Sequence, residues 1–428
     1  PPIALEPPRN CVKTWGMGHG TGVYRATFFI FFMRGVTIGV VGASSLMIAQ
    51  RSGLPQNNLI AIRGLGLTLG PVFLGQVIGR ALWSGESQTC VALALAAKSL
   101  CEFAVPRSTS AGVLYAAFFV MGLGMALLDT YGDVLITRIH GNKCAVPLNI
   151  INAVYGIGGM LAPFVTVSLT ASRAWDLLCL LDLALAASIA ASRFCRGKPK
   201  GWKAKIRGLP GSPLSPKSPA TPEASAPAAG LPPKVLRAGL AFILVAQASE
   251  TAMSAWGFTF AATTLGQPDR VAALFPATFY FAYTAGRFVV VPASMRMLPS
   301  VIVHAGALLT LLGALLLAFL AGGAAPASPT APVGAVLLCV ALVGAGTCPL
   351  FAMMMASLRQ HGDLSPKQQG LYRTCSNLGN TMGMWLPGLV SLPRAELVWA
   401  LALVLILSSS VRSFPRRASR DACGAAEA

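Results

Sequence analysis

The stretch MGLGMALLDTYGDVLITRIHG, residues 121–141, is apolar enough to cross a membrane except at Asp129 and Asp133. A carboxylate at the centre of a bilayer costs about 2.5–3.5 kcal/mol on insertion scales, so a span keeps one only where it has a partner or a use. Two carboxylates four residues apart share one face of a helix. The stretch therefore predicts a transmembrane helix with an acidic face directed into the protein.

The composition of the whole chain agrees with a membrane protein. Of its 428 residues, 54% are hydrophobic and 11% are charged, whereas soluble domains carry about 25% charged residues. Ten cysteines form no CxxC pair and no Cys/His cluster at metal-ligand spacing, so we expect neither a disulfide framework nor a metal site. The chain begins at Pro1 without a recognisable signal peptide, and we expect that N-terminal residues are missing.

Twelve segments are long enough to cross a hydrocarbon core of about 30 Å, which takes about 20 helical residues. The third and the last two are short. The expected spans are 24–50, 58–79, 89–105, 111–137, 147–170, 175–192, 238–263, 271–291, 299–322, 332–357, 374–391 and 397–411.

The net charge of +19 follows from membrane topology. With both termini in the cytoplasm, most Lys and Arg residues fall in cytoplasmic tails and loops, as the positive-inside rule requires. Arg34 and Lys98 stand out as basic residues within spans. We therefore expect a multi-pass protein of the lipid bilayer, in the plasma membrane rather than an organelle, with no nucleic-acid partner.

A basic, proline-rich segment divides the chain. Residues 193–237 can bury no apolar face, and such a composition is typical of disorder. We expect a cytoplasmic linker there, between an N-terminal six-helix bundle (24–192) and a C-terminal one (238–411). Cytoplasmic tails (1–23 and 412–428) complete the predicted organisation.

Two short motifs recur at equivalent places in the two halves. The fifth and eleventh spans contain GMLAP (159–163) and GMWLP (383–387), and the second and eighth end in Gly-Arg (79–80 and 286–287). Halves related by an axis along the membrane normal are common in transporters. The predicted fold is all-α, with twelve transmembrane helices in two pseudo-symmetric six-helix bundles.

The run LLDTYGDVLITRIHGNKCAVPLNIINAVYGIGGMLAP, residues 127–163, resembles the sodium-dependent glucose transporter-like branch of the major facilitator superfamily, which is related to the bacterial fucose permeases. In that branch, the motif of helix 4 begins with an acidic residue followed by Thr, and Asp129 and Thr130 match these two positions. The polar positions of its helix 5 are matched by Asn149 and Asn152. In the second half, SETAMSAWGFTFA (249–261) and FYFAYTAGR (279–287) resemble helices 7 and 8. The resemblance implies the major facilitator fold and solute transport.

Three positions depart from that pattern. Asp133 stands where the branch has Asn, and the acid that fucose permeases carry in helix 1 is missing, with Gly42 near its place. In addition, GPVFLGQVIGRALW (70–83) keeps the glycines and Arg80 of the superfamily's loop motif without its acid. The altered charges mean that neither glucose nor sodium follows from the resemblance.

The candidate ion-coupling residues are Asp129, Asp133 and Arg34. Asp129 and Arg34 lie at similar depths, ~13 and ~15 Å from the cytoplasmic ends of their spans. If these spans adjoin a central path, as in the superfamily, Arg34 neutralises one acid and leaves the other free to bind Na+ or H+. The alternative is a structural ion pair. No cofactor is expected beyond a coupling ion.

The candidate solute-binding residues are polar or aromatic side chains within the spans. Amides and carboxylates suit the hydroxyl groups of a polyol, and aromatic rings suit its C–H faces. The alternative is that these side chains bond across helices. The candidates are Asn149, Asn152, Gln247, Glu250, Trp256 and Asn380.

Three further ionisable residues lie within the spans. Lys98 and Glu102, four apart, predict a self-satisfied pair that faces the surface. Asp182 has no evident partner in the sequence.

Together these features predict a monomeric secondary transporter that moves a small polar solute, foremost a monosaccharide, by alternating access. One alternative is an organic-anion facilitator or exchanger that uses Arg34. Another is a non-transporting receptor or scaffold that acts through its linker. An enzyme is not expected, because no nucleophile, base and orienting group occur at usable spacing.

Overall fold

The computed structural model describes residues 21–84, 87–140, 145–196, 231–322, 332–362 and 366–411. Within these ranges the chain is helical and contains no strand. Most of the three segments expected to lie outside the membrane, namely the tails and the linker, falls outside the described residues.

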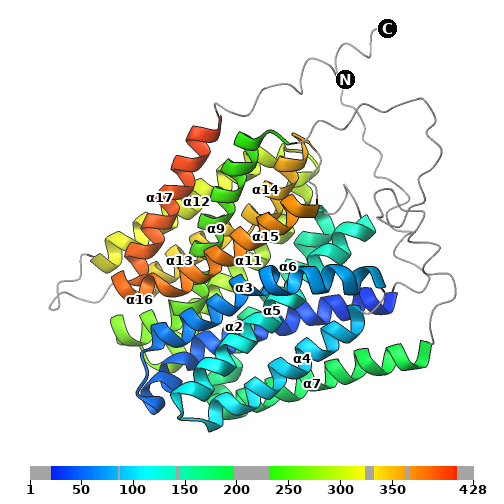
Figure 1. Ribbon diagram of the computed structural model, residues 1–428. Helices are drawn as coiled ribbons and strands as arrows, with labels where there is room; N and C mark the ends of the chain where they lie inside the picture. Colours follow the sequence, from blue (N-terminus) through cyan, green and yellow to red (C-terminus); the bar gives the residue numbers. More distant parts are fainter. Residues whose placement is uncertain are drawn as a thin grey trace, which may run out of the picture.

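Twelve long helices make up the described chain, the tenth of them in two parts (Figure 1). The first six are α2 (Thr21–Ser52), α3 (Gln56–Ser84), α4 (Ser87–Ala104), α5 (Ala111–His140), α6 (Ala145–Leu169) and α7 (Ala171–Arg196). The second six are α9 (Pro233–Thr259), α11 (Leu274–Ser294), α12 (Pro299–Gly322), α13 (Val333–Thr347) with α14 (Leu350–Arg359), α15 (Pro366–Trp385) and α17 (Leu392–Val411). Short elements join them: η1 (Val105–Arg107), a π-helical turn η3 (Phe260–Thr264), α10 (Asp269–Ala272) and α16 (Pro387–Val390).

The helices differ in how apolar they are. Within the described residues, nine are long and apolar enough to cross a membrane: α2, α4, α5, α6, α7, α9, α11, α12 and the α13–α14 pair. The other three are α3, α15 and α17. α3 and α15 pack between the bundles, where Thr68 and Asn377 form hydrogen bonds across the contact.

Each half of the chain uses the same packing order. In the first half, α2 packs on α6, α3 on α5 and α4 on α7. In the second half, α9 packs on α15, α11 on α13 and α12 on α17. In both halves, the first helix thus packs on the fifth, the second on the fourth and the third on the sixth. The two halves form two bundles (Figure 1). The predicted pseudo-symmetric arrangement is confirmed.

The bundles meet along three helix pairs, α2 with α9, α3 with α15 and α6 with α11. A glycine stands at each contact. Gly42 faces the backbone of Ser254, Gly64 faces Thr381, and Gly159 faces Tyr280. A Cβ atom at Gly159 would lie 2.7 Å from the Tyr280 ring. These glycines let the helix backbones of the two bundles approach closely.

Two expected spans have different limits in the structure. The tenth (332–357) breaks between α13 and α14, next to Pro349, which cannot donate a backbone hydrogen bond. The eleventh was expected over 374–391, but α15 begins at Pro366. The residues at its start are polar and resemble a loop in the sequence, yet Arg373 is buried.

Candidate functional site

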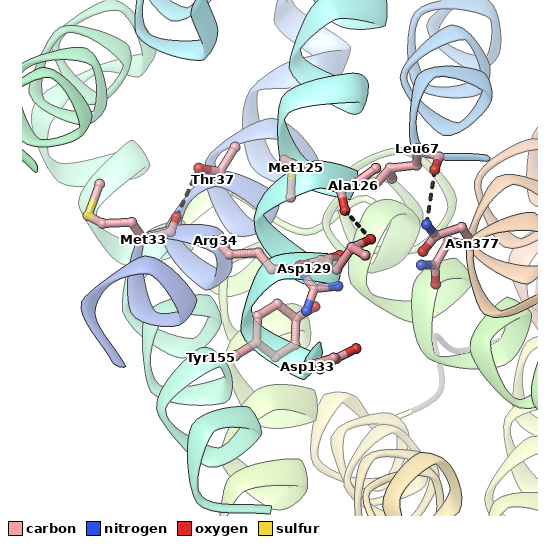
Figure 2. A network of polar contacts seen from close by, with 12 residues as sticks. Met33, Arg34, Thr37, Leu67, Met125, Ala126, Asp129, Asp133, Tyr155 and Asn377 are labelled. Carbon is pink, nitrogen blue, oxygen red and sulfur yellow. Dashed lines mark hydrogen bonds and ion pairs between the residues drawn. The ribbon is translucent and has the colours of Figure 1, made fainter. Parts of the chain in front are cut away.

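A cluster of buried charges lies between the two bundles, with Asp129 on α5 at its centre. Arg34 of α2 reaches Asp129 with an Nε to Oδ1 distance of 2.6 Å. Figure 2 shows the two side chains next to each other. Arg373 of α15 pairs with the other Asp129 oxygen at 2.7 Å and with Asp133 at 3.1 Å. Asp129 is fully buried, whereas the Asp133 side chain keeps 20% of its surface exposed.

The Asp129 carboxylate is therefore held from both bundles. Arg34 belongs to the same bundle as Asp129, and Arg373 belongs to the other. The Arg34 guanidinium also lies 4.7 Å from the centre of the Tyr155 ring, a cation–π distance (Figure 2). The predicted Arg34–Asp129 pairing is confirmed. The expectation that Arg34 leaves the second acid free is wrong for this conformation, because Arg373 pairs with Asp133.

A second polar chain crosses between the bundles beside this cluster. Arg287 of α11 donates to the Asn149 side-chain oxygen of α6 at 3.0 Å and also bonds to the hydroxyl of Tyr283. Tyr283 donates to Glu250 at 3.2 Å, and Gln247 donates to the same carboxylate at 2.8 Å. Three predicted solute-binding residues, Asn149, Gln247 and Glu250, are thus joined in one network through Arg287.

The other three predicted solute-binding residues bond to nearby protein groups. Asn152 donates to the Leu148 carbonyl of its own helix at 2.7 Å. Trp256 donates from its indole to the Met384 carbonyl at 2.8 Å. The Asn380 side-chain oxygen accepts from Thr251 at 2.7 Å. In this conformation these contacts match the cross-helix and local bonding that was the alternative interpretation.

The sequence interpretation missed three buried arginines. Arg34 and Lys98 were singled out as the basic residues within spans, but Arg63, Arg287 and Arg373 also lie within helices and are buried. A signal existed for two of them. Arg63 and Arg287 fall inside the expected spans 58–79 and 271–291, and Arg287 also falls inside the FYFAYTAGR motif. Arg80, which corresponds to Arg287 in the Gly-Arg repeat, has a side chain that lies outside the described residues.

Arg63 on α3 has an unusual environment. The Arg63 side chain is 1% exposed, and its Nη2 donates a hydrogen bond to the thioether sulfur of Met125 at 3.0 Å. Its Nε is buried without a hydrogen-bond partner, and no carboxylate of the described residues pairs with it. Tyr155, Tyr280 and the Arg34–Asp129 pair are its electrostatic neighbours. Of the five N–H donors that a guanidinium offers, the one on Nε thus has no partner.

A separate buried cluster corrects the expectation for Lys98 and Glu102. The two residues do not face the surface, because both are buried and Lys98 also forms an ion pair with Asp182 of α7. Asp182 thus has a partner that the sequence did not reveal, since it lies on a different helix. Within the described residues, no group of three or more His, Cys, Asp or Glu side chains could hold a metal ion.

No known family profile matches the chain, and no curated protein matches it. Solved structures do. The E. coli fucose:proton symporter FucP, in a point-variant form, aligns over 92% of this chain and 98% of its own with a TM-score of 0.60 and 15% identity. The nucleoside transporter NupG, also as a variant, aligns over 92% of this chain and 99% of its own with a TM-score of 0.61 and 12% identity.

The chain has the major facilitator fold. This fold agrees with the helix packing above and with the resemblance found in residues 127–163. The chain is an integral, multi-pass membrane protein. The names of both similar structures describe transporters.

Proposed function

We propose that this chain is a secondary transporter that moves a small polar solute across a membrane by alternating access between its two bundles. The observation that carries this proposal is Asp129, a fully buried carboxylate held by arginines from both bundles. A buried charge between two rigid bodies is costly unless it stays paired, so it is kept where it serves a moving or binding function.

The arrangement suits a gate. When the bundles part on this side, Arg373 leaves with its own bundle while Arg34 remains on Asp129. The central carboxylate then never stands unpaired. Asp133 loses the Arg373 ion pair and is the more exposed of the two acids. In this proposal Asp133 takes up the coupling Na+ or H+, Arg373 competes with that cation, and Asp129 with Arg34 holds the gate.

A monosaccharide is the proposed solute. Asn149, Gln247 and Glu250 join donors and acceptors from both bundles, as a ring of hydroxyl groups requires. Asn152, Trp256 and Asn380 remain candidates for a conformation in which their present bonds have changed. The names of FucP and NupG specify fucose and nucleosides, which both carry sugar hydroxyl groups.

An organic anion is the second candidate solute, and Arg63 is the observation that favours it. The buried charges between the bundles include four arginines (Arg34, Arg63, Arg287 and Arg373) but three acids (Asp129, Asp133 and Glu250). Arg34 is already paired with Asp129, so the role first considered for Arg34 passes to Arg63. A solute carboxylate would supply the charge-assisted, bidentate acceptor that Arg63 lacks.

Uptake by the purified protein in proteoliposomes tests these proposals. Labelled fucose and glucose are compared with labelled gluconate, and proton and sodium gradients are imposed separately. A monosaccharide transporter accumulates a neutral sugar under one of the gradients. An anion transporter accumulates gluconate. Correctly folded protein that accumulates none of these probes under either gradient would contradict both.

Arg63→Gln separates the two solutes. For an anion, losing the guanidinium should weaken the apparent affinity at least tenfold, equivalent to about 1.4 kcal/mol. For a neutral sugar the effect should be within twofold. Arg107→Gln, which removes an exposed ion pair with Asp176, is the matched control and should change neither.

The remaining proposals concern placement. We propose that both termini face the cytoplasm, that the chain resides in the plasma membrane, and that one copy suffices for transport. Epitope tags at the two ends that become accessible only after the membrane is permeabilised support this orientation. A tag that is accessible on intact cells would contradict it.

A further inference from the structure

A compact ionic triad lies inside the N-terminal bundle, away from the contact between the bundles. Lys98 and Glu102 on α4 pair at 2.5 Å, and Lys98 also pairs with Asp182 of α7. The Lys98 ammonium donates a third bond, at 2.7 Å, to the hydroxyl of Thr37 on α2. All three charged side chains are buried.

The charges of this triad do not balance when every group is ionised. Two carboxylates face one ammonium, which leaves one negative charge in an interior that water does not reach. Two carboxylate atoms, Glu102 Oε2 and Asp182 Oδ1, are buried without a hydrogen-bond donor. Both carboxyl groups bond to the same atom, Lys98 Nζ, so they lie close to each other. Two ionised carboxylates cannot bond to each other, because neither carries a donor.

No other charged side chain of the described residues supplies the missing positive charge. From α2 the triad meets Thr37, and from α5 it meets Gly124, whose position faces the Lys98 stem. The remaining titratable neighbour is the thiol of Cys101, one residue before Glu102. The Cys179 thiol of α7 contacts Ser99 instead.

We propose that Glu102 and Asp182 form a proton-binding site in which one proton is shared by the two carboxyl groups, so that the triad as a whole is neutral. The proton supplies a donor to the carboxyl oxygen atoms that lack one. A metal cation fits poorly, because the Lys98 ammonium already bonds to both carboxyl groups and would repel a second cation at that distance. Two close carboxyl groups commonly retain one proton.

The triad also connects to the central cluster through α2. Thr37, which bonds to Lys98, lies one helical turn from Arg34, which holds Asp129. When the shared proton leaves, Lys98 must neutralise two carboxylates and its bond to Thr37 weakens. Proton occupancy would then bias the position of α2 and hence the gate. This link rests on the proposed transport function, whereas the proton site itself does not.

Infrared spectroscopy of the protein in nanodiscs tests the proton site. A protonated carboxyl group has a carbonyl stretch that a carboxylate lacks, and the stretch shifts in deuterated water. The wild type should show such a band at neutral pH for a buried group. Both Glu102→Gln and Asp182→Asn should lose it, because each leaves one carboxylate for one ammonium.

Two controls assign the band. Glu396, another buried carboxyl group, accepts from Ser249 at 2.7 Å, and Glu396→Gln should leave the triad band unchanged. Asp176→Asn removes an exposed carboxylate and should also leave it unchanged. Gln at position 102 donates an N–H bond in place of the proton, so this variant should fold. If one amide variant fails to fold, the other gives the same result.

The outcomes separate the site from the coupling. A wild-type spectrum from which neither amide variant removes a protonated carboxyl band would overturn the proton site, whether or not the protein transports anything. Loss of the band with unchanged proton-driven uptake in Glu102→Gln would keep the site and overturn the link to α2. Loss of the band together with at least a tenfold loss of proton-driven accumulation is the expected result.

Discussion

The central cluster and the Lys98 triad are both buried sets of charges, but they differ in which parts of the molecule they join. The central cluster combines side chains from both bundles, so motion between the bundles can exchange its partners. The triad lies within one bundle and keeps its partners. A buried charge between two bundles that move apart therefore needs a second partner that stays with it. A buried charge inside one bundle must instead be neutralised by the groups that always surround it.

The largest expected effect is on stability, and it tests the triad. Lys98→Met leaves Glu102 and Asp182 buried without a cation, and breaking a buried ion pair in this way costs about 3–5 kcal/mol. The thermal unfolding temperature in detergent should fall well below that of the wild type. Lys98→Arg, which keeps the charge, is the control. An unchanged unfolding temperature for Lys98→Met would contradict the assignment of the triad as a fixed ionic cluster.

The next effect concerns the central cluster. Asp129→Asn removes the carboxylate that both Arg34 and Arg373 share, so we expect it to abolish ion-driven accumulation while expression stays intact. Asp129→Glu keeps the charge and should retain part of the activity. Uptake into proteoliposomes with and without the gradient measures the result. Accumulation equal to the wild type in Asp129→Asn would contradict the proposed role of Asp129 in the gate.

A glycine between the bundles gives a third test. Gly159→Leu directs a large side chain at the Tyr280 ring, where a Cβ atom alone would already lie 2.7 Å away. We expect normal membrane insertion but no transport, because α6 and α11 can no longer pack closely. Gly112→Leu on α5 is the control, since nothing lies within 4 Å of its Cβ position. Equal transport by both variants would show that close packing here is not needed.

The smallest effect is expected outside the two charge clusters. Replacing residues 198–230 with a Gly/Ser segment of equal length should preserve most of the uptake, because the partners described for both clusters lie on the long helices. A receptor or scaffold that acts through this segment would instead lose its activity. Uptake assays on the two chains, with expression matched, distinguish these outcomes.

The parts of the site that the sequence predicted depend on one helix or on matched depth. Asp129 and Asp133 share a face by their spacing, and Arg34 was paired with Asp129 because both lie at a similar depth. The structure confirms that pairing. Local pattern and depth were sufficient there because the partners are on helices whose limits were clear.

The parts that were missed depend on packing between helices. Arg373 lies in a polar stretch that resembles a loop, so its burial against Asp129 could not be inferred from the sequence. Lys98 and Glu102 looked complete as a pair four residues apart, and only the packing of α4 on α7 brings in Asp182.

The repeated motifs show a related limit of the sequence. The proline of GMLAP lies inside α6, whereas that of GMWLP starts α16. Gly159 of the first motif faces the other bundle, while Gly383 of the second faces α9 of its own bundle. The shared motif therefore predicted that the two glycines lie on equivalent helices, but it did not predict which helix each glycine contacts.

In the proposed gate, Arg373 holds the two bundles together on one side through its ion pairs with Asp129 and Asp133. A distance measurement between spin labels at Ala191 of α7 and Gly370 of α15, two exposed positions on different bundles, tests it most directly. Arg373→Gln should shift the distance distribution toward longer values, and the Arg107→Gln control should leave it unchanged. Identical distributions for the wild type and Arg373→Gln would contradict the claim.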